Sequence, residues 1–150
     1  MRSNLLLLVE DNLDDVLLTQ RALKKGHILN ELVVVNDGVE ALEYLFGEGK
    51  YANRDVDIMP EVILLDLKMP KMGGLEVLQR IRGDDRTNLL PVVILTSSKE
   101  EQDVISSYKL GANSYICKPV NYDQFFNAVQ QLGLYWLGLN QSPPKRGKYI

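Results

Sequence analysis

A four-residue apolar run that ends directly in a carboxylate constrains this chain more than any other stretch. Val62 to Leu65 are consecutive aliphatic residues, Asp66 follows them, and a turn containing proline and glycine leads to a helical pattern that begins at Leu75. An apolar run without alternation indicates a strand buried on both faces, as in a parallel sheet covered by helices. Asp66 would then lie at the carboxyl end of a central strand, where open α/β sheets place their ligands.

The same order, an apolar run followed by an amphipathic segment, recurs along the chain. Further strands are predicted at residues 5–9, 32–35, 92–95 and 114–117, with helices at about 12–25, 38–46, 75–82, 100–110 and 125–139. Residues 47–60 are expected to form a polar loop. Five strands alternating with five helices predict an α/β fold in which a doubly wound, five-stranded parallel sheet has helices on both faces.

Helical periodicity predicts which side chains of three helices face the core. In the first helix these are Leu13, Val16, Leu17 and Leu23. In the fourth they are Val104, Ile105 and Tyr108. The last helix has the broadest stripe, formed by Phe125, Phe126, Val129, Leu132, Tyr135, Trp136 and Leu139.

Composition indicates one soluble, globular domain. The 150 residues are 45% hydrophobic and 25% charged, and the net charge of −3 provides no basic field for nucleic acid. The single cysteine, Cys117, cannot form an internal disulfide and is expected to be a small buried hydrophobe. The apolar run at 5–9 is too short to cross a bilayer. We expect a cytoplasmic protein that binds neither nucleic acid nor membrane, with a domain over residues 4–139 and a polar tail over 140–150.

Polar side chains follow four of the five predicted strands. Glu10 and Asp11 come after the first strand, Asp66 after the third, Thr96 after the fourth and Lys118 after the fifth. Parallel strands share one carboxyl edge with a spacing of ~4.8 Å, so these groups are expected to meet there. Like charges ~4 Å apart repel by roughly 4 kcal/mol at an effective dielectric of 20, and the acids therefore need a cation. An all-oxygen site suits Mg²⁺, with Mn²⁺ as a substitute.

The lysine and the hydroxyl indicate that the site also binds an anion. A metal held by carboxylates needs neither Lys118 nor Thr96, whereas a phosphoryl group needs donors of this kind. A phosphoryl group on Asp66 fits all of these residues. Asp66 would be the nucleophile, Mg²⁺ would neutralise the developing charge, and Lys118 and Thr96 would each bind a phosphoryl oxygen.

Four segments together resemble the receiver domain of two-component response regulators, over about residues 5–137. Each segment lies at the end of a predicted strand, and the four occur in the order found in that family. They are Val9-Glu10-Asp11-Asn12, Leu65-Asp66-Leu67-Lys68-Met69-Pro70 with Gly73-Gly74, Leu95-Thr96-Ser97, and Ala112-Asn113-Ser114-Tyr115-Ile116-Cys117-Lys118-Pro119. The resemblance implies the flavodoxin-like receiver fold.

The resemblance also implies how the phosphoryl group and the metal are held. Asp66 resembles the aspartate that accepts a phosphoryl group from a sensor histidine kinase. Asp11, Asp66 and the backbone carbonyl of Lys68 resemble the direct metal ligands, and Glu10 would act largely through water. Lys118 resembles the phosphoryl-binding lysine.

A further set of residues is implied to switch. Thr96 resembles the hydroxyl that moves toward the phosphoryl group, and Tyr115 resembles the aromatic residue whose rotamer follows it. The peptide bond between Lys118 and Pro119 is implied to be cis, which X–Pro bonds tolerate. Output would come from a repacked surface formed by the fourth helix, fifth strand and fifth helix.

A narrower similarity concerns the stand-alone regulators that pair with bacterial phytochromes. It is based on residues 46–51, Phe-Gly-Glu-Gly-Lys-Tyr, and residues 134–137, Leu-Tyr-Trp-Leu. These regulators lack an output domain and tend to form homodimers. The implied partner is a phytochrome-type histidine kinase, and the downstream partner is not indicated.

Two other functions remain as alternatives. A Mg²⁺-dependent phosphatase or phosphotransferase could also work through an aspartyl-phosphate, but many such enzymes need a second carboxylate where this chain has Lys68. A scaffold without phosphorylation would not need the acids, Thr96 and Lys118. The leading prediction is a response regulator with no catalysis beyond its own phosphorylation and dephosphorylation.

Overall fold

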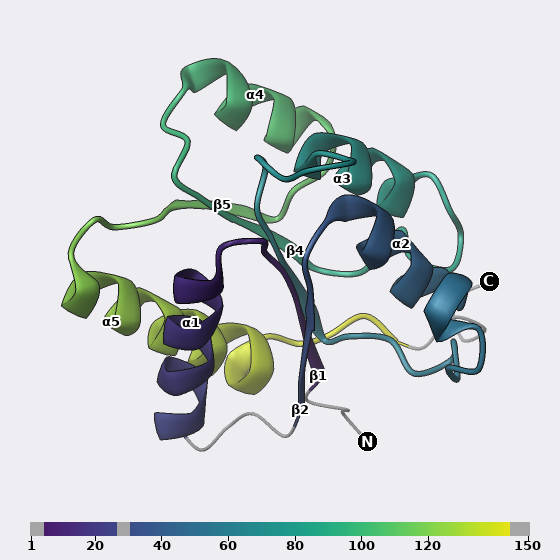
Figure 1. The fold of residues 1–150 in the computed structure, drawn as a ribbon, viewed down its shortest axis with the longest axis horizontal. Coiled ribbons are helices and arrows are strands. Elements are labelled where there is room, and N and C mark those ends of the chain that lie inside the picture. The colour runs from purple at the N-terminus through teal and green to yellow at the C-terminus, as the bar shows by residue number, and fades with distance from the viewer. Residues whose placement is uncertain (1–4, 27–30, 145–150) are drawn as a thin grey trace.

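A computed structural model describes residues 5–26 and 31–144, and five parallel strands alternate with five α-helices in it (Figure 1). The predicted fold class is confirmed. The elements are β1 (Leu5–Val9), α1 (Leu13–Lys25), β2 (Glu31–Val35), α2 (Gly38–Phe46), η1 (Gly49–Tyr51), β3 (Val62–Leu65), α3 (Gly74–Arg82), β4 (Val92–Thr96), α4 (Glu101–Lys109), β5 (Ser114–Cys117), α5 (Tyr122–Gly133) and η2 (Leu134–Leu139).

The strand order β2-β1-β3-β4-β5 places the first and third strands side by side at the centre of the sheet. The chain leaves β1 toward β2 on one side and returns to β3 on the other, so the order reverses between β1 and β3. Open α/β sheets bind ligands at such a point, outside the carboxyl ends of the strands. Glu10 follows β1 and Asp66 follows β3, so both acids lie at this point.

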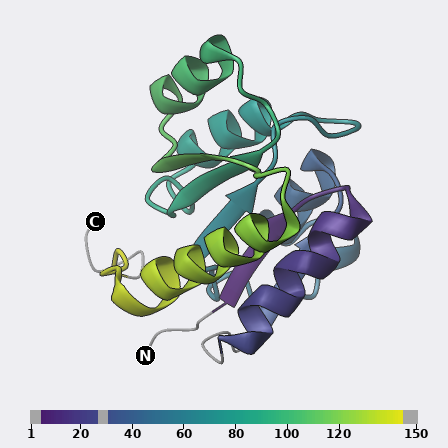
Figure 2. The same ribbon diagram turned by 90° about the vertical axis from the view of Figure 1, so that its left-hand side faces the viewer.

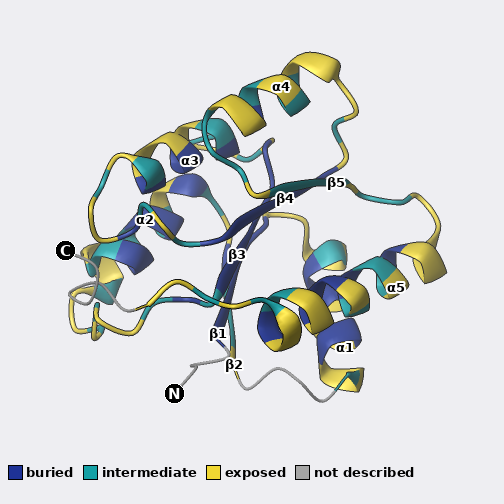
Figure 3. Cartoon of the chain, turned by 180° about the vertical axis from the view of Figure 1, so that it is seen from behind, coloured by how far each residue is buried: buried dark blue, intermediate teal, exposed yellow. Residues whose placement is uncertain are grey.

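The aliphatic runs of β1, β3 and β4 are buried on both faces of the sheet, as expected, whereas the edge strand β2 is mostly half-buried (Figure 3). Successive side chains of a strand point to opposite faces. Leu6 and Leu8 contact the layer formed by α1 and α5, whereas Leu7 and Val9 contact the layer on the other face. Figure 2 shows α1 and α5 together on one face of the sheet.

Three predicted helix faces are partly wrong. In α1, Leu13 is 69% and Leu17 is 44% exposed, because the residues at helical spacing that reach the sheet are Val16, Thr19 and Leu23. In α4, Ile105 and Tyr108 are exposed and Ser107 is buried. Figure 1 shows α4 at the outer end of its layer, and Ser107 is the buried residue of this helix.

The last helix departs from the predicted stripe because its winding changes. The α-helix ends at Gly133 and continues as a π-helix, in which Asn140 N–H donates to Tyr135 O five residues earlier. The wider turn brings Leu137 into the core and leaves Leu139 78% exposed, with Tyr135 also exposed. A stripe extrapolated at 3.6 residues per turn cannot anticipate this rotation.

Two segments predicted to be irregular are held by polar contacts. The 47–60 loop contains η1, and Arg54 donates to the carbonyls of Tyr44 and Leu45 at the end of α2. In the predicted tail, the Ser142 hydroxyl donates to the carboxylate of Glu61, just before β3. Residues 145–150 of the tail lie outside the described part of the chain. None of the described helices has the length and hydrophobicity required to cross a membrane.

Candidate functional site

Three carboxylates meet at the carboxyl edge of β1 and β3. Oxygens of Glu10, Asp11 and Asp66 lie within 4.8 Å of one another. Glu10 is 2% and Asp66 7% exposed, whereas Asp11 is open to solvent. The predicted acidic cluster is therefore present, with two buried members and one that faces outward.

The backbone fixes both buried acids. The Asp66 N–H donates to Val9 O at 3.1 Å, which continues the β1–β3 ladder to the acid, and Glu10 N–H donates to Val35 O at 3.0 Å. One carboxylate oxygen of Asp66 also accepts from the Leu67 N–H at 2.7 Å. This hydrogen bond from the next residue fixes the rotamer of the Asp66 side chain.

A glycine allows the following helix to approach Asp66. A Cβ on Gly74 would lie 2.2 Å from Asp66 O and 2.8 Å from Leu67 Cα. Neither of these backbone atoms can move without moving the acid, so only glycine fits here. Gly73 and Gly74 thus have two roles: they allow the chain to turn after β3, and Gly74 allows α3 to pack closely against the backbone of Asp66.

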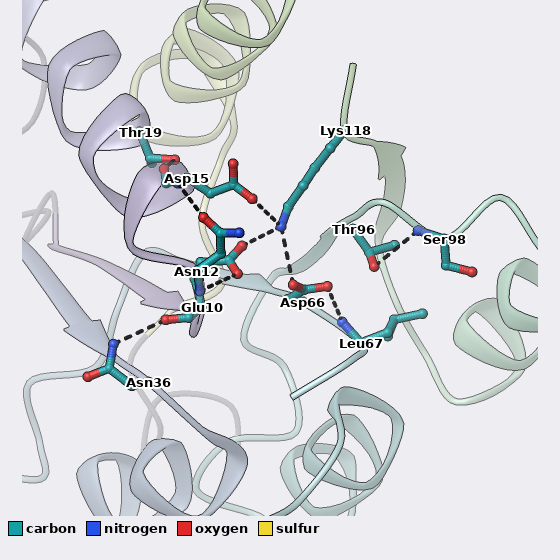
Figure 4. A network of polar contacts seen from close by, with 10 residues as sticks. All are labelled: Glu10, Asn12, Asp15, Thr19, Asn36, Asp66, Leu67, Thr96, Ser98 and Lys118. Atoms are coloured by element: carbon teal, nitrogen blue, oxygen red, sulfur yellow. Dashed lines mark hydrogen bonds and ion pairs between the residues drawn. The ribbon is translucent and has the colours of Figure 1, made fainter. Parts of the chain in front are cut away.

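Lys118 reaches the acids from the end of β5 (Figure 4). Its Nζ lies 2.6 Å from Glu10 Oε1, 2.8 Å from Asp15 Oδ2 and 3.2 Å from Asp66 Oδ2. The predicted association of Lys118 with Glu10 and Asp66 is therefore present. Asp15 is a partner that the sequence reasoning missed, because an acid in the first turn of a helix is ordinarily explained by the helix dipole.

Burial and charge change the pKa of two of these groups. Burial raises the pKa of Glu10 to about 7, and the hydrogen bond from Lys118 offsets only part of this, while the charge of Asp66 adds to it. Burial alone would lower the pKa of Lys118, but the hydrogen bonds to Asp15 and Glu10 and the charge of Asp66 outweigh it and raise the pKa well above its ordinary value. Lys118 therefore remains a cation, while Glu10 titrates near neutral pH.

Thr96 and Tyr115 lie beside the acids, on β4 and β5. Thr96 is fully buried at the end of β4, and its hydroxyl accepts from the Ser98 N–H at 3.4 Å. The Tyr115 hydroxyl donates to Ser98 O at 3.0 Å. Burial raises the pKa of Tyr115. Both predicted switch residues thus contact the same residue of the β4–α4 loop.

Lys68 directs its ammonium away from the acids. Its Nζ lies 3.6 Å from Asp103 Oδ2 on α4, and the same oxygen accepts from Ser98 Oγ at 2.6 Å. The pair joins the β3–α3 loop to α4 across the outer side of the site. That the backbone carbonyl of Lys68 binds the metal stays a prediction.

Two expectations about β5 are wrong. The Lys118–Pro119 peptide bond is trans, since the described residues contain no cis peptide bond. The trans bond still allows the Lys118 N–H to donate to Thr96 O at 2.7 Å. Cys117 is exposed, not buried, because β5 is the edge strand and ends where the helices no longer cover it.

The cluster fits a hard divalent cation. Its donors are carboxylate oxygens, and the exposed side at Asp11 leaves room for the water ligands that Mg²⁺ retains. Mn²⁺ accepts the same donors. Burial, and to a smaller extent the charge of Asp66, raise the pKa of Glu10, and such a cation would relieve the repulsion between these two acids.

Family comparison assigns the class of protein. Residues 6–130 match the response regulator receiver domain. The chain belongs to this family, whose members are phosphorylated on an aspartate and act as signalling switches, not as classical enzymes. The acidic cluster of Glu10, Asp11 and Asp66 is its divalent-metal site.

Among individual proteins, the chain is similar to phytochrome response regulators. It is 42% identical to response regulator Rcp1 of Synechocystis over 88% of each chain. The Mn²⁺-bound structure of Rcp1 superimposes with a TM-score of 0.87 at 40% identity and covers 93% of this chain and 99% of that one. The phosphorylated cyanobacterial phytochrome response regulator RcpA gives 0.87 at 42% identity, covering 93% and 98%. The bacteriophytochrome response regulator AtBRR gives 0.71 at 53% identity, covering 91% and 97%.

Proposed function

We propose that Asp66 is the aspartate that accepts the phosphoryl group, and that the donor is a sensor histidine kinase of the phytochrome type. The observation that carries this proposal is the convergence of a buried lysine and two further acids on Asp66. Asp66 belongs to the acidic cluster, contacts Lys118 at 3.2 Å and follows the central strand β3, whereas Glu10 and Asp11 both follow β1. The similarity to phytochrome response regulators supports the choice of kinase.

The transfer forms an acyl phosphate. A carboxylate oxygen of Asp66 attacks phosphorus, the P–N bond to the kinase histidine breaks, and the imidazole leaves with that electron pair and takes up a proton. Lys118 supplies a fixed positive charge beside the incoming phosphoryl oxygens. A divalent ion held by Glu10, Asp11, Asp66 and the Lys68 carbonyl would neutralise the charge that develops on these oxygens.

Thr96 and Tyr115 are proposed to transmit the change. The Thr96 hydroxyl lies next to the phosphorylation edge and can exchange its contact with the Ser98 N–H for a phosphoryl oxygen. Ser98 would move with it, and the Tyr115 hydroxyl, which donates to Ser98 O, would follow. The movement would reach α4, whose exposed residues Ile105 and Tyr108 provide an apolar surface for a downstream protein.

The kinase is proposed to dock beside the start of α1. Leu13 and Leu17 are exposed there, and Val120 in the β5–α5 connection is 96% exposed. Leu13 comes two residues after Asp11 in the chain, and Val120 comes two residues after Lys118. Apolar residues around a buried acid suit a partner whose histidine must enter the site. Leu17→Glu should slow transfer from the kinase while leaving labelling by acetyl phosphate unchanged.

A second copy of the chain is proposed as another partner. Leu134, Tyr135 and Leu139 are all exposed on the helical extension that follows α5. Sedimentation of wild type and Leu139→Asp should show a dimer that the substitution weakens, and a wild-type monomer at all concentrations contradicts the assignment. We place the domain at 4–139 and the protein in the cytoplasm, without nucleic-acid or membrane partners.

The proposed function is tested by labelling with acetyl phosphate. With Mg²⁺, intact-mass measurement should show one hydroxylamine-labile phosphoryl group per chain, and peptide mapping should place it on Asp66. Labelling should be lost in Asp66→Asn, reduced when EDTA replaces Mg²⁺, and kept in Asp85→Asn, which removes an exposed acid from a distant loop. Labelling that persists in Asp66→Asn contradicts the proposal.

A further inference from the structure

Lys118 has a carboxylate partner that the acidic cluster does not include. Its ammonium contacts Asp15 Oδ2 at 2.8 Å, closer than its 3.2 Å contact with Asp66. Asp15 comes from α1, one turn beyond the segment that supplies Glu10 and Asp11, and it is not part of the group of acids that could hold a metal. Its carboxylate therefore serves the lysine and not the cation.

The position of Asp15 is fixed by the helix around it (Figure 4). Asn12 caps α1 by accepting from the Asp15 N–H at 3.1 Å, and the Thr19 hydroxyl donates to Asp15 O at 2.7 Å. The Asn12 N–H in turn donates to Glu10 Oε2 at 3.1 Å. A chain of hydrogen bonds thus connects Glu10 through Asn12 to Asp15, and both acids bond to the same ammonium.

Donor counting shows that this arrangement must change on phosphorylation. An ammonium has three N–H donors, and here three carboxylates approach the nitrogen of Lys118. A phosphoryl group on Asp66 would bring about two more negative charges and three acceptor oxygens within reach of the same nitrogen. Phosphoryl oxygens that take two of the three donors displace the contact with Asp66 and one further contact, and Glu10 cannot readily lose its partner, because it is 2% exposed.

The Asp15 contact is the least costly to lose. The side chain of Asp15 is 25% exposed, against 3% for Glu10 and 9% for Asp66, so water can replace the ammonium there. We propose that Asp15 is a positioning residue that holds Lys118 in the unphosphorylated site and releases it when Asp66 is phosphorylated. Asp15 then competes with the phosphoryl group for the lysine and limits the stability of the phosphorylated state.

Release would also change the surface of α1. With Lys118 bound, the charge of Asp15 is partly offset by the ammonium. After release, a free carboxylate lies in the first turn, between the exposed residues Leu13 and Leu17. This helix is where we place the kinase. The inference rests on the proposed function, and adds that phosphorylation makes the docking surface for the kinase more negative.

The test uses beryllium fluoride, which mimics a phosphoryl group on an aspartate, in the presence of Mg²⁺. Binding is followed by ¹⁹F NMR, which detects weak as well as tight binding, in wild type, Asp15→Asn, Asp14→Asn, Lys118→Met and the double variant Asp15→Asn/Lys118→Met. Asp14→Asn is the matched control, since it removes the neighbouring exposed charge on α1, which makes no contact with Lys118 in the structure. Mg²⁺ affinity is measured separately in each variant.

Asp15→Asn should bind the mimic roughly 3- to 10-fold more tightly than wild type, the range expected for one partly exposed charged contact. Asp14→Asn should change affinity less than twofold by the same reasoning, since it removes no contact. In the Lys118→Met background, Asp15→Asn should no longer increase the affinity for the mimic, because Asp15 acts through its contact with Lys118.

The outcomes separate this inference from the proposed function. If wild type does not bind the mimic at all, the proposed function is wrong. If wild type binds but Asp15→Asn gains nothing, binds more weakly, or gains equally without Lys118, the positioning role alone is overturned. A gain of equal size in Asp14→Asn would show a general charge effect and would also overturn it.

Discussion

The raised pKa of Glu10 predicts how the stability of the metal-free protein depends on pH. The carboxyl group has a pKa of about 7 in the folded protein, against an ordinary value of 4.5. Between these values the folded chain binds more protons than the unfolded chain, so the free energy of unfolding falls as the pH rises through this window. Once the pH is well above 7, the stabilisation contributed by the protonated Glu10 is lost completely.

The size of the effect follows from the same two values. A difference of one pKa unit corresponds to about 1.4 kcal/mol, so the move from 4.5 to about 7 gives an upper value of about 3 kcal/mol. Glu10→Gln has nearly the same shape, carries no charge, and retains an oxygen that can accept from Lys118. Relative to this variant, wild type should lose about 2.5 kcal/mol of stability between pH 5 and pH 8, a range that spans most of the window.

Urea unfolding in EDTA, followed by the fluorescence of Trp136 and by circular dichroism, measures this difference. Glu76→Gln serves as the control, because Glu76 is an exposed glutamate on α3 whose curve should run parallel to that of wild type. At pH 8, Mg²⁺ at 100 times its dissociation constant should return about 2.7 kcal/mol to wild type, and less to Glu10→Gln. A difference between wild type and Glu10→Gln that stays flat across the pH range would refute the reasoning.

Two further predictions concern the frame of the site. Gly74→Ala should lower the free energy of unfolding by roughly 2–4 kcal/mol and impair labelling of Asp66, because the new Cβ would lie 2.2 Å from Asp66 O. Gly138→Ala is the control, because no atom lies within 4 Å of its new Cβ. In parallel urea titrations this control should keep its free energy of unfolding, and its labelling should be normal. Asp103→Asn should slow autodephosphorylation roughly 2- to 5-fold, since the freed Lys68 ammonium can pair with the phosphoryl group. The decay of the hydroxylamine-labile label measures this, with Glu100→Gln as control, and an unchanged or faster decay contradicts it.

Residues that lie at the ends of strands were the most predictable part of the site. The buried runs of β1, β3 and β4 could be recognised from their lack of alternation, and parallel strands must end at one edge, so the meeting of Glu10, Asp66 and Lys118 followed from topology. Asp15 could not be found in this way, because it lies on a helix and its direction depends on how α1 crosses the sheet. Asp103 was missed for the same reason.

The helix faces show a second limit. Leu13 and Leu17 fit an apolar stripe in the sequence, yet both are exposed because the face of α1 that is buried runs through Val16, Thr19 and Leu23. Leu137 is buried and Leu139 is exposed because a π-helix replaces the α-helix after Gly133. In both cases the pattern predicts a helix, whereas burial depends on which side of the helix meets its neighbours or on a change of winding.

The distance along the chain between the partners of Lys118 has a consequence for biogenesis. The lysine lies 108 positions after Glu10 and 52 positions after Asp66, and it arrives on the last strand to be synthesised. A ribosome-bound chain that has completed β3 already carries Asp66, the proposed acceptor, but lacks the lysine that contacts it. The proposed phosphorylation site is thus completed only when nearly the whole domain has been translated.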